Sequence, residues 1–182
     1  MLKLLTLIAA SVVLAFVSRA SLRAPGSHGF YRFFAWELVL VLVVLNADGW
    51  FGTALTADQI VGGIFMNISL LLVVIGYLSL RQFGKQDETR DDAPLLRFEK
   101  TTVLVTHGIY RYIRHPMYSS LIFLCWGLFF SHISWLSGIV ALTASVFLVI
   151  TARAEESENI RYFGAPYRKY MELTKLFVPF LL

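Results

Sequence analysis

Five apolar runs, separated by segments that carry charged or turn-forming residues, organise the sequence. They cover residues 4–17, 33–45, 60–80, 119–130 and 133–152. A helix needs about 20 residues to cross the hydrocarbon core of a bilayer, so the second and fourth runs reach that length only with their aromatic flanks. The pattern predicts an all-α integral membrane protein with about five transmembrane helices.

The composition agrees with this class of protein. Hydrophobic residues make up 57% of the chain and charged residues 15%, whereas soluble domains average about 45–50% and about 25%. Cys125 is the only cysteine, so an internal disulfide and a CxxC-type metal site are excluded. No metal is expected, because the histidines are scattered singly: His28, His107, His115 and His132. The absence of GxSxG, P-loop and GxGxxG motifs gives no support to triad hydrolysis or phosphoryl transfer.

Loop charge predicts the orientation. Residues 18–32, 81–116 and 153–182 contain lysines and arginines, whereas residues 46–59 and 131–134 contain none. Basic loops stay in the cytoplasm, so this alternation predicts an N-terminus outside and a C-terminus in the cytoplasm, in a bacterial-type inner membrane or its equivalent. The net charge of +4 is therefore a topology signal. Membrane lipids are expected partners, and neither nucleic acid nor an obligate protein partner is.

The first apolar run has a second interpretation. Lys3, the run itself and Ser18-Arg19-Ala20 would also suit a secretory signal peptide. We expect a first transmembrane helix instead. Four tryptophans are expected to form interfacial belts at the membrane surfaces: Trp36, Trp50, Trp126 and Trp135.

The turn between the fourth and fifth runs contains at most residues 132–134. Two helices joined so tightly must be antiparallel neighbours, that is, a helical hairpin. Residues 108–118 and 153–158 should therefore meet at the cytoplasmic side. We divide the chain into N-terminal transmembrane helices (residues 1–80) and a catalytic region with a cytoplasmic loop, the hairpin and a C-terminal cap (residues 81–182).

The stretch 108–118 concentrates polar chemistry beside an apolar run. Gly108 permits a close turn, and Pro116 suits the first turn of the fourth helix. Free backbone N–H groups at a helix start bind a carboxylate or similar anion, and Arg111, Arg114 and His115 add donors. Alternatively, the arginines and tyrosines serve only as an interfacial anchor.

Residues 153–158 place three glutamates at the cytoplasmic end of a helix: Glu155, Glu156 and Glu158. This position is unfavourable with respect to the helix dipole. The cluster indicates a bound cation or pairing with the arginines opposite, unless it is simply a solvated face. Beyond it, residues 160–170 indicate an interfacial segment broken at Gly164 and Pro166, which could cap a site opening sideways to lipid.

Several motifs resemble the isoprenylcysteine carboxyl methyltransferase family, and more loosely the phospholipid N-methyltransferases. The resemblance covers residues 80–182 and rests on residues 102–110, Arg114-His115-Pro116-Met117-Tyr118, Glu155-Glu156, Phe163-Gly164 and Tyr167. It implies S-adenosylmethionine at the cytoplasmic end of the hairpin, with S-adenosylhomocysteine as product. The cofactor-binding residues that it implies are Thr102, Val103, Leu104, Val105, Gly108, Tyr110, Arg114, His115, Pro116, Met117 and Tyr118. The implied catalytic candidates are Glu155, with Glu156 as its alternative, and Arg153.

Two departures from the family concern the acceptor. Family members that methylate prenylcysteine carry an arginine four residues before the glutamate, where this chain has Thr151, and Arg153 is a displaced candidate. Residues 81–85 also do not match the family's stretch after the third span. The acceptor therefore stays open among a prenylcysteine-like carboxylate, a phospholipid amine and a small thiol.

The residues leave two further alternatives. One is an NADPH-dependent membrane reductase of the sterol-reductase type. The other is a non-catalytic scaffold or small transporter. A transporter is expected to place ionisable groups in the middle of the membrane, and Glu37, near the start of the second run, is its one candidate.

Overall fold

The computed structural model describes residues 1–47, 56–85 and 100–179, and the regular elements within them are helical apart from one isolated bridge. The helices are α1 (Leu2–Val17), α2 (Arg19–Leu22), α3 (His28–Asn46), α4 (Ala57–Phe83), η3 (Gly108–Arg111), α5 (Pro116–Ser131), α6 (Trp135–Phe163) and α7 (Ala165–Leu173). Trp50 and the basic residues Arg90 and Arg97 lie outside the described residues.

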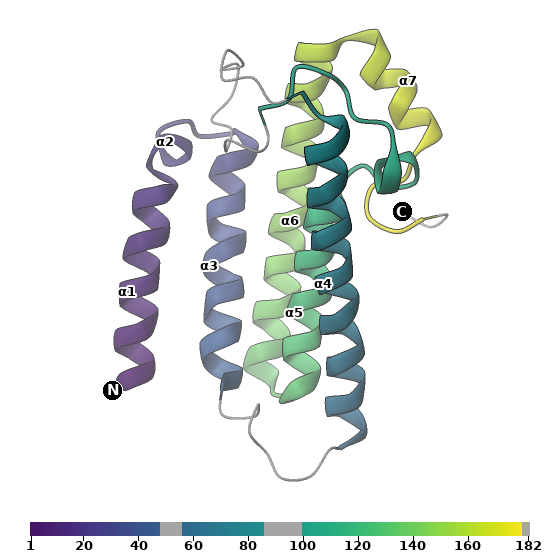
Figure 1. Ribbon diagram of the computed structural model, residues 1–182. Helices are drawn as coiled ribbons and strands as arrows, with labels where there is room; N and C mark the ends of the chain where they lie inside the picture. Colours follow the sequence, from purple (N-terminus) through teal and green to yellow (C-terminus); the bar gives the residue numbers. More distant parts are fainter. Residues whose placement is uncertain (48–55, 86–99, 180–182) are drawn as a thin grey trace.

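The five long helices run up and down in a bundle, with α1 at its edge (Figure 1). α4 packs chiefly on α5, and α3 packs chiefly on α6. Three helices, α3, α4 and α6, are long and apolar enough to cross a membrane, and α1 and α5 are shorter apolar helices. The predicted all-α membrane fold is confirmed. The described parts of the three segments that the sequence marks as basic lie at one end of the bundle, which we call the basic end (Figure 1).

Helix capping explains where the helices begin. α3 begins at His28, earlier than residue 33, because the Ser27 side chain accepts a hydrogen bond from the Phe30 N–H. α4 begins after a capping box between Thr56 and Gln59. Because α3 starts earlier, Glu37 lies well inside the helix rather than near its end. The Ser11 hydroxyl donates a hydrogen bond of 2.7 Å to the Glu37 carboxylate.

The hairpin between α5 and α6 forms as predicted. α5 ends at Ser131, and a capping box between Ser134 and Ser137 begins α6. α6 then continues past the apolar run to Phe163, so the acidic cluster at 153–158 is helical. Alanine, arginine and glutamate are good helix formers, so the helix outlasts the hydrophobic pattern.

Small residues bring α4 and α5 into close contact. A Cβ atom at Gly62 would lie 2.8 Å from the Gly127 carbonyl oxygen, and one at Gly127 would lie 2.8 Å from the Met66 Cγ. Such close backbone approach is typical of helix packing in membranes. Nearer the basic end, a Cβ atom at Gly76 would lie 3.3 Å from Pro116 Cγ, so the start of α5 packs closely on α4.

α6 and α7 are joined by a sharp turn. Gly164 has a φ of 67°, which favours glycine, and it is both the C-cap of α6 and the N-cap of α7. Pro166 lies in the first turn of α7, so the two breaks expected at Gly164 and Pro166 form a single turn. α7 folds back beside η3 (Figure 1), and the Tyr170 hydroxyl donates a hydrogen bond of 2.7 Å to the Tyr110 carbonyl.

Candidate functional site

A pocket lies at the basic end, between the start of α5 and the later part of α6. Its polar part is formed by Tyr110, Arg114, His115, Glu155, Asn159, Tyr167 and Tyr170. Towards the middle of the bundle the lining becomes apolar, with Trp36 from α3, Val73 from α4, and Met117 and Leu121 from α5. The pocket therefore joins a polar chamber at the helix ends to an apolar part flanked by the spans.

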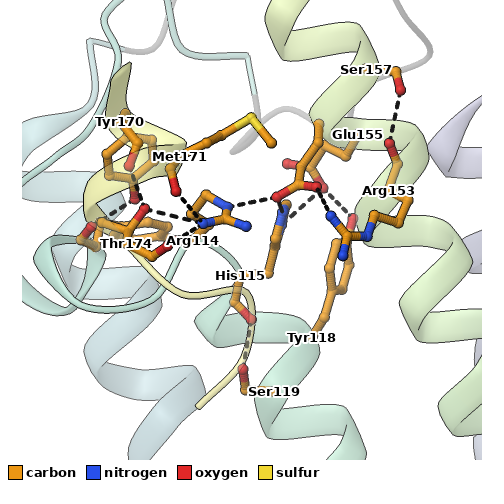
Figure 2. A network of polar contacts seen from close by, with 12 residues as sticks. Arg114, His115, Tyr118, Ser119, Arg153, Glu155, Ser157, Tyr170, Met171 and Thr174 are labelled. Carbon is orange, nitrogen blue, oxygen red and sulfur yellow. Dashed lines mark hydrogen bonds and ion pairs between the residues drawn. The ribbon is translucent and has the colours of Figure 1, made fainter. Parts of the chain in front are cut away.

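The hairpin brings a carboxylate, a phenol and an imidazole together in the polar part (Figure 2). The Tyr118 hydroxyl donates a hydrogen bond of 2.6 Å to Glu155 Oε2. His115 Nδ1 lies 3.8 Å from the same oxygen, and the His115 ring stacks on Tyr118 with ring centres 5.5 Å apart. Glu155 is thus held at the pocket wall by a residue from the opposite helix of the hairpin.

His115 also presents an atom that lacks a partner. The residue is 4% exposed, and its Nε2 atom makes no hydrogen bond to any described residue. The nearest carboxylate oxygen, Glu156 Oε1, lies 3.8 Å away. Buried polar atoms nearly always have a hydrogen-bond partner, so an orphaned nitrogen on a pocket wall indicates a place for a ligand.

Arg114, on the pocket wall, forms a buried ion pair with Glu156, which does not line the pocket. Arg114 Nε donates to Glu156 Oε1 over 2.6 Å, and the two side chains are 8% and 3% exposed. Arg153 donates to the second oxygen of Glu156 over 3.1 Å. The predicted pairing between the acidic cluster and the arginines opposite is therefore present, and it neutralises the buried charge of Glu156.

Arg114 also anchors the C-terminal segment over the pocket (Figure 2). Its Nη1 donates to the Met171 carbonyl over 3.1 Å and to the Thr174 carbonyl. The backbone N–H groups of Arg114 and His115 donate to Lys175 and Leu176 over 2.8 and 3.2 Å. These donors, which the sequence suggested for an anionic ligand, instead hold the cap in place.

The tyrosines of α7 are buried phenols. Burial raises the pKa of Tyr170 above its usual range. Burial, followed by the negative charges of Glu155 and Glu156, raises the pKa of Tyr167 as well. Both phenols therefore remain protonated and neutral, and Tyr170 keeps its donor for the Tyr110 carbonyl.

Most of the residues expected at the site line the pocket. They are Leu104, Val105, Tyr110, Arg114, His115, Pro116, Met117, Tyr118 and Glu155. Thr102 and Gly108 do not line it: the Thr102 N–H donates to the Lys85 carbonyl, and Gly108 has a φ of 64° and lies against Ser79. Val103 also lies outside the lining and is 41% exposed.

Two catalytic candidates also lie outside the lining. Glu156 is buried behind the wall, and the side chain of Arg153 is 62% exposed. Arg153 therefore lies apart from the pocket, and Thr151, where the family's arginine is absent, is fully buried and donates to the Phe147 carbonyl.

Sequence reasoning did not find the α3 wall. Arg32, expected in a loop, lies inside α3, is 3% exposed and lines the pocket. Its guanidinium lies 4.9 Å from the ring centre of Trp36, which also lines the pocket. The signal that could have found this wall is the spacing of four residues, which places Arg32 and Trp36 on one helix face.

The other described tryptophans do not line the pocket. Trp126 packs edge-on against Phe129, and Trp135 is 91% exposed at the start of α6. The interfacial position expected for Trp135 thus agrees with its exposure at a helix end.

A buried histidine fixes α3 against α6. The His28 N–H donates to Glu158 Oε1 over 2.9 Å, and its ring Nδ1 lies within hydrogen-bond distance of Glu158 Oε2. His28 is fully buried, and Glu158 is 6% exposed. Glu158 thus binds the first residue of α3 and fixes the helix that carries Arg32.

Comparisons with known proteins identify the family of the chain. Residues 57–165, from the start of α4 to the start of α7, match the phospholipid methyltransferase family. The chain is also similar to a methanethiol S-methyltransferase from Pseudomonas deceptionensis, with 29% identity over 73 residues, which cover 40% of this chain and 27% of that protein. The match thus spans only about a quarter of that relative's length. No solved structure matches.

The family match contains the hairpin together with the residues that form its polar wall, namely His115, Tyr118 and Glu155. It covers more than half of the chain. Apart from Tyr167, the motifs that suggested a membrane methyltransferase lie within the matched region, and the protein belongs to the phospholipid methyltransferase family.

Proposed function

We propose that the protein transfers a methyl group from S-adenosylmethionine to a lipophilic acceptor at the cytoplasmic face of the membrane. The observation that carries this proposal is the pocket, whose polar wall holds Glu155 and the unpartnered Nε2 of His115 while its deeper wall is apolar. The family match supports a methyltransferase and does not favour a nicotinamide-dependent reductase.

The polar wall suits the donor. When bound, S-adenosylmethionine supplies a methyl group on a positively charged sulfonium, from which the acceptor's lone pair takes the methyl carbon as the carbon–sulfur bond breaks and S-adenosylhomocysteine is left. The carboxylate of Glu155 would stabilise that positive charge. His115 Nε2 would hydrogen-bond to the donor, and Tyr110, Phe163 and Tyr167 offer ring surfaces to an adenine.

The pocket also contains a residue that could accept a proton from the methyl acceptor. A carboxylate acceptor has none to lose, whereas an amine or a thiol must lose one. Glu155 would accept it, because it lines the pocket and Tyr118 fixes its orientation. Glu156 is the less suitable base, because Arg114 and Arg153 already bind its two oxygens.

The rest of the catalysis would come from positioning. The hairpin and the C-terminal cap would hold the two substrates together in a chamber poor in water. The hydrogen bonds from Arg114 to the Met171 and Thr174 carbonyls keep that cap closed over the pocket. The protein would thus act as a rigid holder whose walls fix both reacting groups.

The acceptor is lipophilic because Trp36, Val73 and Leu121 extend the pocket between the spans. A prenylcysteine-like carboxylate and a phospholipid amine both have a long apolar part. A small thiol is the second candidate, because the matched relative is a methanethiol S-methyltransferase.

The proposed orientation places the basic end in the cytoplasm and the N-terminus outside, in a bacterial-type inner membrane. The basic residues of the loops support it. Protease accessibility in sealed inverted vesicles tests it: cleavage near Arg168 is expected there and not in intact cells.

Ligand-dependent thermal unfolding tests the donor. S-adenosylhomocysteine at one hundred times its Kd is expected to stabilise the protein by about 2.7 kcal/mol, and NADPH is expected to have no effect. His115→Ala should weaken the response to S-adenosylhomocysteine. A response to NADPH alone would indicate the reductase, and no response to either nucleotide would indicate a scaffold. Methylating membrane extracts with labelled donor and identifying the labelled lipid would then name the acceptor.

A further inference from the structure

The outer surface of the C-terminal cap carries positive charges that pair with no described residue. Four basic side chains are exposed there, and we call them the cap face: Arg111, Arg168, Lys169 and Lys175. None of the four forms an ion pair within the part of the chain that the structure describes. The arginines beside Glu156 differ, because Arg114 and Arg153 both donate to its carboxylate. The cap face is therefore available to an anion from outside the protein.

α7 has two different sides. On its inner side, Tyr167 and Tyr170 are buried and line the pocket. On its outer side, Arg168 and Lys169 are exposed, and Leu173 at its end is 74% exposed. A ligand that binds the outer side of α7 would thus act on the same helix that closes the pocket.

The cap face lies at the level where a span begins. The Lys175 N–H donates to the Tyr112 carbonyl over 3.0 Å, and the Arg114 N–H donates to the Lys175 carbonyl over 2.8 Å. Only two residues after Arg114, Pro116 begins the apolar helix α5. α7 lies beside the bundle at its basic end (Figure 1). Lipid headgroups lie at this level of a membrane protein.

The chemistry of the cap face also favours lipid over a soluble polyanion. Exposed lysines and arginines are attracted to the anionic headgroups of a leaflet, and each contributes about fivefold in affinity when it lies near the surface. The exposed Leu173 suits the boundary between headgroups and acyl chains. A nucleic acid or a free phosphate would leave this leucine in water.

We propose that the cap face binds the phosphate groups of anionic membrane lipids, and that an anionic leaflet thereby holds the C-terminal cap closed over the pocket. Lipid binding at this surface is separate from the proposed reaction, because none of the four side chains lines the pocket. The effect on the pocket rests on the proposed function, since it is read through the methyl donor's product.

The first experiment measures lipid preference directly. Full-length protein is placed in phosphatidylcholine nanodiscs with a trace of spin-labelled phosphatidylglycerol or spin-labelled phosphatidylcholine, and electron spin resonance gives the fraction of each lipid held at the protein. Phosphatidylglycerol should be held preferentially, and sodium chloride should weaken the preference because the charges are exposed. Sodium phosphate at the same ionic strength should weaken it no further.

Two double variants, each of which removes two positive charges, then assign the preference. Arg168→Gln combined with Lys169→Gln should lower it by about fivefold or more, because both charges of the outer side of α7 are lost. The matched control is Arg19→Gln combined with Arg23→Gln. These exposed arginines lie at the basic end as well, on α2 and its C-cap, away from α7 (Figure 1). The control should keep the preference.

The second experiment measures the effect on the pocket. The Kd of S-adenosylhomocysteine is obtained from thermal unfolding in phosphatidylcholine nanodiscs and in nanodiscs of equal parts phosphatidylcholine and phosphatidylglycerol. Coupling between two sites typically changes affinity by about fivefold or more, so the wild-type protein should bind the nucleotide about fivefold more tightly in the mixed nanodiscs. The Arg168→Gln, Lys169→Gln variant should bind it equally in both.

Four results would overturn the inference. They are a wild-type protein without lipid preference, a preference lost equally in both double variants, a stronger effect of phosphate than of chloride, and a wild-type Kd that is the same in the two kinds of nanodisc. The third would assign the cap face to a soluble phosphate. Failure of the proposed function looks different, because the protein would then not respond to S-adenosylhomocysteine in either nanodisc while its lipid preference persisted.

Discussion

Tyr118 on α5 donates a hydrogen bond of 2.6 Å to Glu155 on α6, and this contact closes the pocket end of the hairpin. The two residues lie far apart in the sequence, and the three-residue turn of the hairpin is what brings them together. The contact leaves Glu155 partly accessible, at 24% exposure of its side chain, while it fixes the direction of the carboxylate. The proposed role of Glu155 in methyl transfer therefore depends on this hydrogen bond.

Removing this hydrogen bond should slow the reaction without preventing donor binding. Tyr118→Phe leaves the ring that stacks on His115 and removes only the hydroxyl. Hydrogen bonds to charged groups contribute about 1.5–3 kcal/mol, so kcat should fall by about tenfold or more. Tyr112→Phe is the control, because Tyr112 is 51% exposed and does not line the pocket. Equal rates in wild-type and Tyr118→Phe protein would show that Glu155 does not need this support.

Replacing Glu155 by glutamine should affect turnover, whereas the same replacement at Glu156 should affect stability. Glu155→Gln alters a pocket residue and should lower turnover with little effect on stability. Glu156→Gln leaves the buried guanidinium of Arg114 without its counter-charge, and breaking a buried pair costs about 3–5 kcal/mol of unfolding free energy. Denaturant unfolding and initial rates, measured on both variants, check this. If Glu155→Gln were instead the less stable of the two, the assignment of roles would be wrong.

The helices and the hairpin were predictable because apolar periodicity and loop charge are local properties of the sequence. The extension of α6 to Phe163 was not, because the hydrophobic pattern ends at residue 152 while the helix propensity of the next residues remains high. The early start of α3 depends on the Ser27 cap. That start moved both Arg32 and Glu37 away from their expected positions.

One wall of the site could likewise be predicted from the sequence, and the other could not. The wall of His115, Tyr118 and Glu155 could be predicted, because its residues form short motifs on the two helices of one hairpin. Arg32 and Trp36 could not, since they reach the pocket through the packing of α3 on α6, which no local pattern encodes. The role of Arg114 as an anchor of the C-terminal cap depends likewise on a carbonyl of Thr174 that lies far away in the sequence.

The close contact between α4 and α5 gives a prediction about stability with a neighbouring control. In Gly62→Ala the new methyl group would lie 2.8 Å from the Gly127 carbonyl oxygen and 3.0 Å from the Ser131 nitrogen, which are backbone atoms that cannot move aside. Overpacking of this kind costs about 1–3 kcal/mol, so the variant should unfold at a lower temperature.

Gly63→Ala is the matched change, because a Cβ atom there would meet nothing within 4 Å. Alanine is favoured over glycine in a helix by about 1 kcal/mol, so this variant should be as stable as the wild type or slightly more stable. Thermal unfolding of both variants in the same nanodiscs provides the comparison. Equal losses of stability in the two would mean that α4 and α5 do not meet at Gly62.

The buried pair of His28 and Glu158 should contribute to the stability of the bundle. Glu158→Gln replaces a carboxylate that accepts the His28 N–H and lies against the His28 ring, and both residues are buried. A loss of about 1–3 kcal/mol of unfolding free energy is expected. Glu172→Gln, at an exposed position on α7, should leave the unfolding free energy unchanged. Denaturant unfolding of the two variants checks this, and equal stabilities would show that the pair does not hold α3 against α6.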